Sequence, residues 1–214
     1  MKTFIFDLDG TLLDTLGDLA ASVNYALRTH GMPEHSIDDV RRFVGNGVRK
    51  LMERAIPDGA SNPGFEATFA TFRQHYMEHS LDTTKPYDGI LETLAGLRER
   101  GCRLAVVSNK MMAATQELCR HFFPDTIEVA IGEDEAHGIR KKPAPDTVFE
   151  SLRQLDAGIQ GAVYVGDSDV DIETAAHAGI PCVSVLWGFR DRDFLIKHGA
   201  KTFISAPSEL LQLL

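Results

Sequence analysis

The sequence is poor in cysteine, short of basic residues and without a long hydrophobic run. Its three cysteines, Cys102, Cys119 and Cys182, lack metal-ligand spacing, which indicates buried free thiols in a reducing compartment. The net charge of -9 argues against nucleic acid or an anionic membrane as a partner, because both favour a basic surface. Asp7 interrupts the first apolar stretch too early for a signal peptide or a membrane span. We therefore expect a cytoplasmic protein that binds neither nucleic acid nor membrane.

Apolar β runs alternate with helical patterns over most of the chain. The β runs are at 3–7, 103–107, 127–131, 162–166, 181–186 and 201–205, and the helical patterns are at 88–100, 111–121, 145–156, 169–177 and 207–214. Strands that alternate with helices predict a parallel sheet. The fold class is therefore α/β, with a doubly wound, mainly parallel sheet.

Residues 16–82 break this alternation and have the pattern of consecutive helices. Thr15 and Asp18 predict one capping box, and Ser36 and Asp39 predict another. A further helix, opened by Asn-Pro, carries an aromatic stripe that we expect to be packing core: Phe65, Phe69, Phe72 and Tyr76. We expect a core of residues 1–15 and 83–214, and an inserted all-helical domain of residues 16–82.

Two carboxylates end the first β run. Asp7 and Asp9 are two residues apart, so in a strand they point to one side, and Gly10 and Thr11 follow at once. Open α/β sheets bind their ligands at this carboxyl edge. Two such carboxylates repel each other unless a proton or a cation lies between them, which points to a metal. The alternative is a strand end followed by a turn or a helix cap.

Polar residues follow three other β runs. Ser108 and Asn109 follow the run at 103–107, where Ser108 could equally be a helix N-cap. Lys142 precedes a proline in KKPAPD and could offer a point charge to phosphate or be a solvated lysine. Asp167 and Asp171 are one helical turn apart, a spacing that is destabilising for like charges unless a hard cation binds them. Magnesium is the candidate because it prefers oxygen ligands.

The ordered set of motifs resembles the haloacid dehalogenase superfamily. The set consists of D-x-D-G-T at 7–11, Ser108 after a strand, Lys142 in K-P-x-P-D, and G-D-x-x-x-D at 166–171. The resemblance spans nearly the whole chain. It implies a Rossmann-like core sheet with a helical cap inserted after the first motif, and phosphoryl transfer through an aspartyl phosphate.

Residue by residue, the resemblance implies catalytic roles for four side chains. Asp7 would be the nucleophile, and Asp9 would act first as general acid and then as general base. Ser108 and Lys142 would hold the phosphate oxygens. The expected substrate-binding residues are Gly10, Thr11, Asn46, Gly47, Ser108, Asn109 and Lys142.

The resemblance also implies a Mg²⁺ site. Its ligands would be Asp7, the backbone carbonyl of Asp9, and Asp167. Asp171 would hold a coordinated water or orient Lys142. The expected partner is a small phosphorylated metabolite, and the protein would be a monomer or a homodimer.

A glycine-rich loop marks the helical insertion. Gly45 and Gly47 flank Asn46 and permit a tight turn between two helices, although a plain C-cap followed by an N-cap explains them equally well. The stretch VGNG followed by LMERA resembles bacterial phosphoglycolate phosphatases. That resemblance implies 2-phosphoglycolate as the leading substrate and a cap loop that reaches toward it.

Other functions remain open at this point. A sugar phosphomutase or a pyrophosphatase of the same superfamily would use the same four motifs. A response-regulator receiver would also accept phosphate on an aspartate, but it lacks an acid at the position of Asp9 and a helical insertion. The segment from Trp187 to Arg190 follows a strand, so it could line the core side of the cleft, although a packing loop is the favoured interpretation.

Overall fold

The structure, a computed structural model, describes residues 2–214. The chain divides into two compact units, residues 2–13 with 86–214, and residues 14–85. Two short strands pair where the chain passes from one unit to the other: β2 (Leu13–Asp14) and β3 (Lys85–Pro86).

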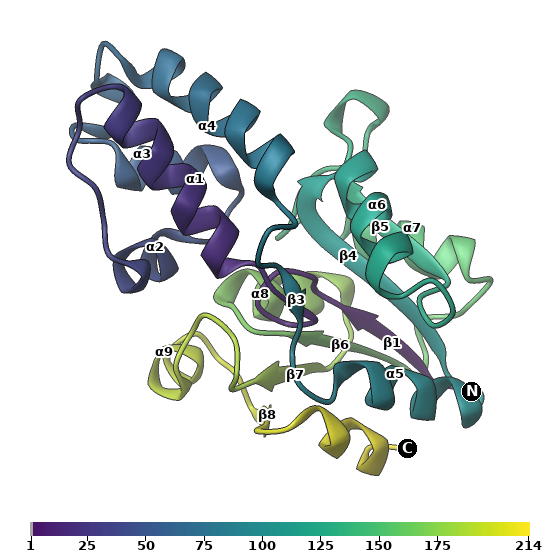
Figure 1. Cartoon of the computed structure of the whole chain (residues 1–214). Coiled ribbons are helices and arrows are strands. Elements are labelled where there is room, and N and C mark those ends of the chain that lie inside the picture. The colour runs from purple at the N-terminus through teal and green to yellow at the C-terminus, as the bar shows by residue number, and fades with distance from the viewer. Residues whose placement is uncertain (1) are drawn as a thin grey trace. The chain divides into compact units, whose positions relative to one another are not determined.

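The larger unit contains a six-stranded parallel sheet. Its strands are β1 (Thr3–Phe6), β4 (Arg103–Met111), β5 (Val129–Glu133), β6 (Ala162–Gly166), β7 (Cys182–Val185) and β8 (Thr202–Ile204). The order is β5-β4-β1-β6-β7-β8, and every pair is parallel (Figure 1). This sheet confirms the predicted α/β class, and it places the first strand of the chain between β4 and β6.

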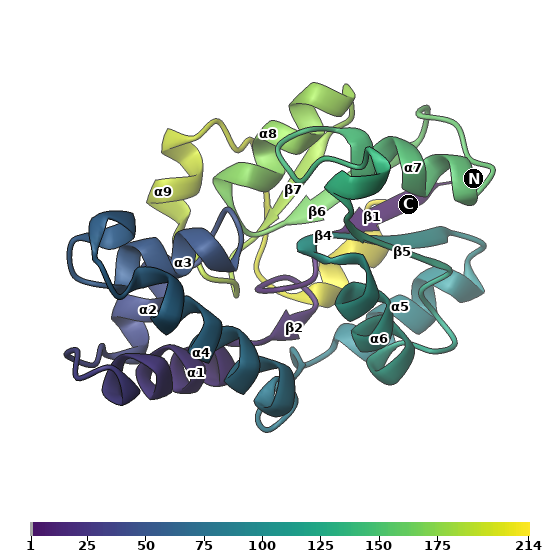
Figure 2. The same cartoon turned by 90° about the horizontal axis from the view of Figure 1, so that it is seen from above.

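Helices cover both faces of this sheet (Figure 2). They are α5 (Ile90–Glu99), α6 (Met112–Phe122), α7 (Asp146–Gln154), α8 (Asp169–Ala178) and α9 (Arg192–Lys197), with 3₁₀ helices at Glu135–His137 and Pro207–Gln212. Side chains of α5 and α6 pack on one face, and those of α7 and α8 pack on the other. The predicted helix at 207–214 is a 3₁₀ helix, and α9 was not predicted because six residues carry little periodicity.

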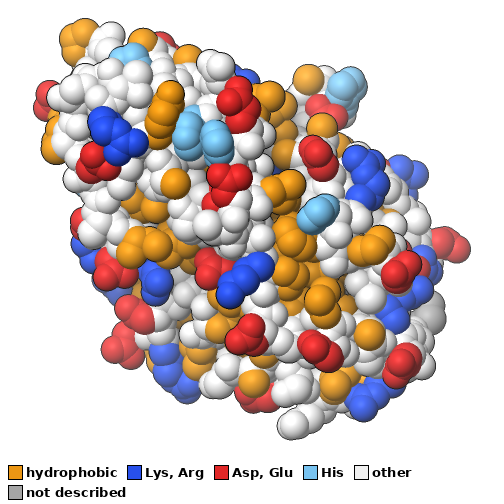
Figure 3. Space-filling view, in the orientation of Figure 1, with side chains coloured by type: hydrophobic (Ala, Val, Ile, Leu, Met, Phe, Trp, Pro, Cys, Tyr) orange, Lys and Arg blue, Asp and Glu red, His pale blue; other side chains and the backbone are white. Residues whose placement is uncertain are grey.

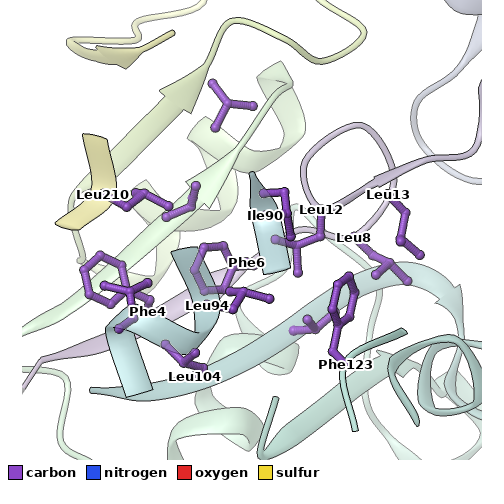
Figure 4. Packing of buried hydrophobic residues seen from close by; sticks show 14 of the residues in the cluster. Phe4, Phe6, Leu8, Leu12, Leu13, Ile90, Leu94, Leu104, Phe123 and Leu210 are labelled. Atoms are coloured by element: carbon purple, nitrogen blue, oxygen red, sulfur yellow. The ribbon is translucent and has the colours of Figure 1, made fainter. Parts of the chain in front are cut away.

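Alternate residues of β1 divide the core into two layers. Phe4 and Phe6 pack with Leu94 and Leu104 on the α5 side, as Figure 4 shows. Ile5 packs on the opposite side, among residues of α7 and α8. Burial of each such side chain contributes about 1.5–3 kcal/mol, so this strand is fixed from both faces.

The smaller unit is a helical bundle. It contains α1 (Leu16–Thr29), α2 (Ile37–Phe43), α3 (Val48–Ala55), a 3₁₀ helix (Gly59–Ser61) and α4 (Phe65–His79). Helices α1 and α4 lie side by side (Figure 1). The predicted aromatic stripe stacks along α4, with successive ring centroids 6.0, 6.4 and 5.6 Å apart.

One of the two predicted capping boxes is wrong. Ser36 and Asp39 form theirs: the Asp39 amide donates to Ser36 Oγ over 3.2 Å, and the Ser36 amide donates to Asp39 Oδ2 over 3.1 Å. Thr15, however, makes no side-chain cap to α1. Asp18 instead accepts hydrogen bonds from the amides and hydroxyls of Thr83 and Thr84. A contact with a distant segment has replaced the local one.

The three cysteines are free thiols. Burial raises the pKa of Cys119 and of Cys182 to about 12, which disfavours the thiolate form of both at neutral pH. Lys and Arg side chains are interspersed with Asp and Glu on the face shown in Figure 3. Across residues 2–214, none of the helices combines the length and the apolar character that a membrane span needs.

Candidate active site

The predicted site residues of the larger unit meet at the carboxyl edge of three adjacent strands. Asp7 directly follows β1, Ser108 lies near the end of β4, and Asp167 directly follows β6. The Asp7 amide continues the ladder by donating to the Val165 carbonyl over 2.9 Å. Since β4 and β6 flank β1, residues far apart in the sequence are brought to one point.

Three carboxylates crowd together at this edge. Asp7, Asp167 and Asp171 each offer an oxygen, all within 4.8 Å of one another, and their exposed fractions are 8%, 1% and 0%. Burial, and next the charge of Asp171, raise the pKa of Asp7 well above its usual range and that of Asp167 to about 7. The cluster therefore favours binding of positive charge.

Lys142 supplies part of that charge. Its Nζ lies 2.7 Å from Asp7 Oδ1 and 2.8 Å from Asp171 Oδ1, and the side chain is 3% exposed. Burial alone would lower the pKa of Lys142, but the charges of Asp171 and Asp7 raise it above its usual value. Lys142 is thus a buried ammonium and not a solvated lysine.

Backbone contacts fix the position of Lys142. The Asn109 amide nitrogen donates to the Lys142 carbonyl over 3.0 Å, and the Lys142 amide donates to Asn109 Oδ1 over 2.6 Å. The peptide bond from Lys142 to Pro143 is cis. Asn109, predicted to bind substrate, therefore joins the end of β4 to the Lys142 segment.

Asp171 is surrounded by donors. Its Oδ1 accepts from Lys142 and from the Tyr164 hydroxyl, the latter over 2.9 Å. Its Oδ2 accepts from the amides of Asp167 and Ser168 and from the Ser168 hydroxyl. With both oxygens engaged, Asp171 is better suited to orienting Lys142 than to direct metal coordination. Tyr164 was not predicted as a site residue, because nothing in its strand distinguishes it from a core aromatic.

The loop after β7 holds Asp167 in place. The Phe189 amide donates to Asp167 Oδ2 over 2.7 Å, and Trp187 Nε1 donates to the Thr11 carbonyl over 3.0 Å. A Cβ on Gly188 would lie 2.3 Å from Asp167 Cβ, so only glycine fits there. Of the two interpretations of this segment, the contacts favour the one that places it beside the site, and its position after a strand was the signal for it.

Gly10 and Thr11 of the D-x-D-G-T motif lie against Asp167. Gly10 has φ +85°, and a Cβ there would lie 2.4 Å from Asp167 Oδ2. Thr11 Oγ1 donates to Asp167 Oδ1 over 3.4 Å. Asp9 lies apart from the carboxylate cluster, and its Oδ1 lies 3.2 Å from Lys110 Nζ. Ser108 is buried, and its Oγ accepts from the Lys110 amide over 3.1 Å.

Asn46 and Gly47 belong to the smaller unit, between α2 and α3. Gly45, Asn46 and Gly47 all have positive φ, at 122°, 64° and 86°. Arg54 Nη1 donates to the carbonyls of Phe43 and Gly45 and so fixes the turn. The tight turn is as predicted, and a substrate contact from Asn46 or Gly47 stays a prediction.

The donor set fits a hard divalent cation. Carboxylate oxygens are the ligands that such ions prefer, and Asp7 and Asp167 offer them in a buried place where like charges repel. Asp9 could add only its backbone carbonyl, since its side chain turns to Lys110.

Comparison with known proteins agrees with this geometry. The sequence profile of the haloacid dehalogenase-like hydrolases matches residues 4–185. A phosphoglycolate phosphatase of Aquifex aeolicus is 34% identical, covering 100% of this chain and 97% of the relative. An N-acetylmuramic acid 6-phosphate phosphatase of Pseudomonas aeruginosa is 30% identical, covering 100% and 95%. A crystal structure of a candidate phosphoglycolate phosphatase from Lactobacillus delbrueckii subsp. bulgaricus superimposes with a TM-score of 0.94 at 35% identity, covering 99% and 97%.

The chain therefore belongs to the haloacid dehalogenase-like hydrolase family. Within that family it is a phosphatase that acts on a small phosphorylated substrate, and proteins of this kind generally use a divalent metal.

Proposed function

We propose that the protein is a magnesium-dependent phosphomonoester hydrolase whose substrate is 2-phosphoglycolate. The observation that carries the chemistry is the buried cluster of Asp7, Lys142, Asp167 and Asp171 at the edge of β1 and β6. The substrate is supported by the relatives from Aquifex aeolicus and Lactobacillus delbrueckii, which match over nearly their whole length. We expect a cytoplasmic monomer or homodimer.

Asp7 is the proposed nucleophile. Its Oδ1 already accepts from the Leu8 amide and from Lys142, so Oδ2 is the oxygen that attacks phosphorus. The bond from phosphorus to the ester oxygen breaks as the aspartyl phosphate forms, which splits one difficult displacement into two easier ones. Water then attacks the aspartyl phosphate and releases inorganic phosphate.

Asp9 is the proposed proton carrier. It donates a proton to the leaving alkoxide in the first step and takes one from the attacking water in the second. Because Asp9 lies outside the carboxylate cluster and is not paired with Lys142, it can change charge without disturbing the groups that hold the nucleophile.

Ser108 and Lys142 hold the phosphate oxygens, with backbone groups of Gly10 and Thr11. Lys142 bridges Asp7 and Asp171, so its charge lies where negative charge develops during transfer. Mg²⁺, held by Asp7, Asp167 and the Asp9 carbonyl, would supply charge neutralisation as a Lewis acid. Asp171 orients Lys142.

The helical residues 16–82 are proposed to act as a lid. Closure of a lid excludes water and brings selective groups to the substrate. The fixed turn of Asn46 and Gly47 is the proposed contact of that lid with substrate. Replacement of Asn46 by Ala is expected to reduce discrimination among phosphomonoesters, as measured by kcat/KM for each.

A substrate panel tests the proposed function. Phosphate release would be measured with Mg²⁺ for 2-phosphoglycolate, N-acetylmuramic acid 6-phosphate, β-glucose 1-phosphate and pyrophosphate. The highest kcat/KM is expected for 2-phosphoglycolate. A preference for another ester would overturn the substrate, and isomerised sugar phosphate without free phosphate would overturn the hydrolase.

A further inference from the structure

We propose that Lys110 selects substrates whose leaving group carries a negative charge next to the ester oxygen. This inference rests on the proposed function and deepens it, because 2-phosphoglycolate has a carboxylate in that position. The lysine was not among the residues expected from the sequence to bind substrate.

The backbone of Lys110 is held from several directions. Its amide donates to Ser108 Oγ over 3.1 Å, and its carbonyl accepts from Thr115 Oγ1 over 3.3 Å. The neighbouring strand β5 approaches so closely that a Cβ on Gly132 would lie 2.5 Å from the Lys110 carbonyl oxygen. The side chain is 11% exposed. The backbone of Lys110 is therefore fixed at the edge of the site, and its side chain is largely buried.

The ammonium of Lys110 lies beside the proposed proton carrier. Its Nζ is 3.2 Å from Asp9 Oδ1, and this buried oxygen accepts no hydrogen bond in the described structure. The contact is thus an ion pair without hydrogen-bond geometry. An ammonium has three donors, so Lys110 can pair with Asp9 and a second carboxylate together.

The second carboxylate is the one on the leaving group of the substrate. Asp9 gives its proton to the ester oxygen, so the group beside Asp9 is also beside the leaving group. In 2-phosphoglycolate a single methylene separates the ester oxygen from the carboxylate. Lys142 does not serve this carboxylate because it bridges Asp7 and Asp171, also contacts the Tyr164 hydroxyl, and is assigned to the phosphate oxygens. Lys110, whose ammonium lies beside Asp9, is placed to hold it.

Kinetics with two matched esters test the inference. The selectivity is the ratio of kcat/KM for 2-phosphoglycolate to that for ethyl phosphate, which replaces the carboxylate with a methyl group. Lys110→Met is expected to lower this ratio about 10- to 100-fold, the range of one charge-assisted hydrogen bond. Lys110→Arg should restore part of it, and Lys201→Met, which removes an exposed positive charge from the same unit, should not change it. Because any general disturbance of Asp9 affects both esters, it cancels in the ratio.

Binding of unreactive analogues gives an independent measurement. 3-Phosphonopropionate and propylphosphonate are isosteres of the two esters that cannot be hydrolysed, and their competitive inhibition constants report binding alone. The preference for the charged analogue should fall in Lys110→Met by the same factor. An unchanged preference in both assays, or a wild-type ratio near one, overturns the role of Lys110 while hydrolysis of 2-phosphoglycolate stands. Failure of the wild type to hydrolyse 2-phosphoglycolate overturns the proposed function instead.

Discussion

Asp7 is held by contacts on a single oxygen. Leu8 and Lys142 both donate to Oδ1, and an asparagine at this position keeps an oxygen for the same two donors. Asp7→Asn should therefore fold normally and lose its nucleophile. We expect phosphate release to fall by at least about a thousandfold, with the thermal midpoint within a few degrees of wild type. Turnover near the wild-type rate in this variant would remove the covalent mechanism.

Gly188 is a second position where a small change is expected to affect activity, because an added Cβ would collide with Asp167. A methyl group there would meet Asp167 Cβ at 2.3 Å and the Gly10 carbonyl at 2.5 Å, so Gly188→Ala must displace Asp167. The Mg²⁺ concentration for half-maximal activity should rise by about tenfold or more. Gly158→Ala is the matched control, because a Cβ at Gly158 meets nothing within 4 Å. An unchanged Mg²⁺ dependence in Gly188→Ala would show that this loop does not position Asp167.

At the same scale, the sequence predicted the charged residues of the site better than the residues that hold them through hydrogen bonds. Asp7 and Asp167 follow apolar runs, where a carboxylate is conspicuous. Tyr164 and Phe189 carry no such signal. Tyr164 acts through a hydroxyl directed at Asp171, and Phe189 acts through its backbone amide, and neither function depends on a pattern of residue types.

At the scale of elements, strands were predictable because each buries an apolar run between helices. The position of β6 is as predicted, whereas β4 continues to Met111 because that residue pairs with Glu133 of β5. The end of β4 depends on pairing with a strand far along the chain. Such a contact cannot be predicted from the local sequence.

Asp18 of α1 also makes a contact with a distant segment that the local sequence did not predict, and this contact leads to a prediction about stability. It is buried and accepts hydrogen bonds from the amides and hydroxyls of Thr83 and Thr84. Asp18→Ala leaves these donors without their acceptor, which should lower the free energy of unfolding by about 2–4 kcal/mol.

Urea denaturation followed by circular dichroism measures this loss. Asp38→Ala, an exposed change in α2, should stay within about 0.5 kcal/mol of wild type. Equal stability of the two variants would mean that α1 does not depend on its contact with the 83–84 segment.

At the scale of the whole molecule, the buried carboxylates link stability to metal. A cation that binds only the folded state stabilises it by about 2.7 kcal/mol at a hundred times its dissociation constant. For a chain of this size that corresponds to a rise in thermal midpoint of roughly 5–10 °C. We expect Mg²⁺ to raise the midpoint, and EDTA to lower it and to stop hydrolysis reversibly.

The variant Asp167→Asn separates this site from non-specific binding. It should lose the Mg²⁺-dependent shift, whereas the exposed Asp125→Asn should keep it. A protein whose midpoint and activity are both indifferent to EDTA would contradict the metal assignment.

The position of β1 in the sheet has a consequence for biosynthesis. This strand leaves the ribosome before its two neighbours, β4 and β6, and β6 ends only at Gly166. Until β6 has been synthesised, one edge of the nascent strand has no partner in the sheet, and its apolar residues need protection from association. Nascent chains arrested shortly before residue 162 should therefore be cleaved readily by protease within β1, and chains arrested beyond the C-terminus should resist; resistance of both would mean that the early strand finds shelter by another route.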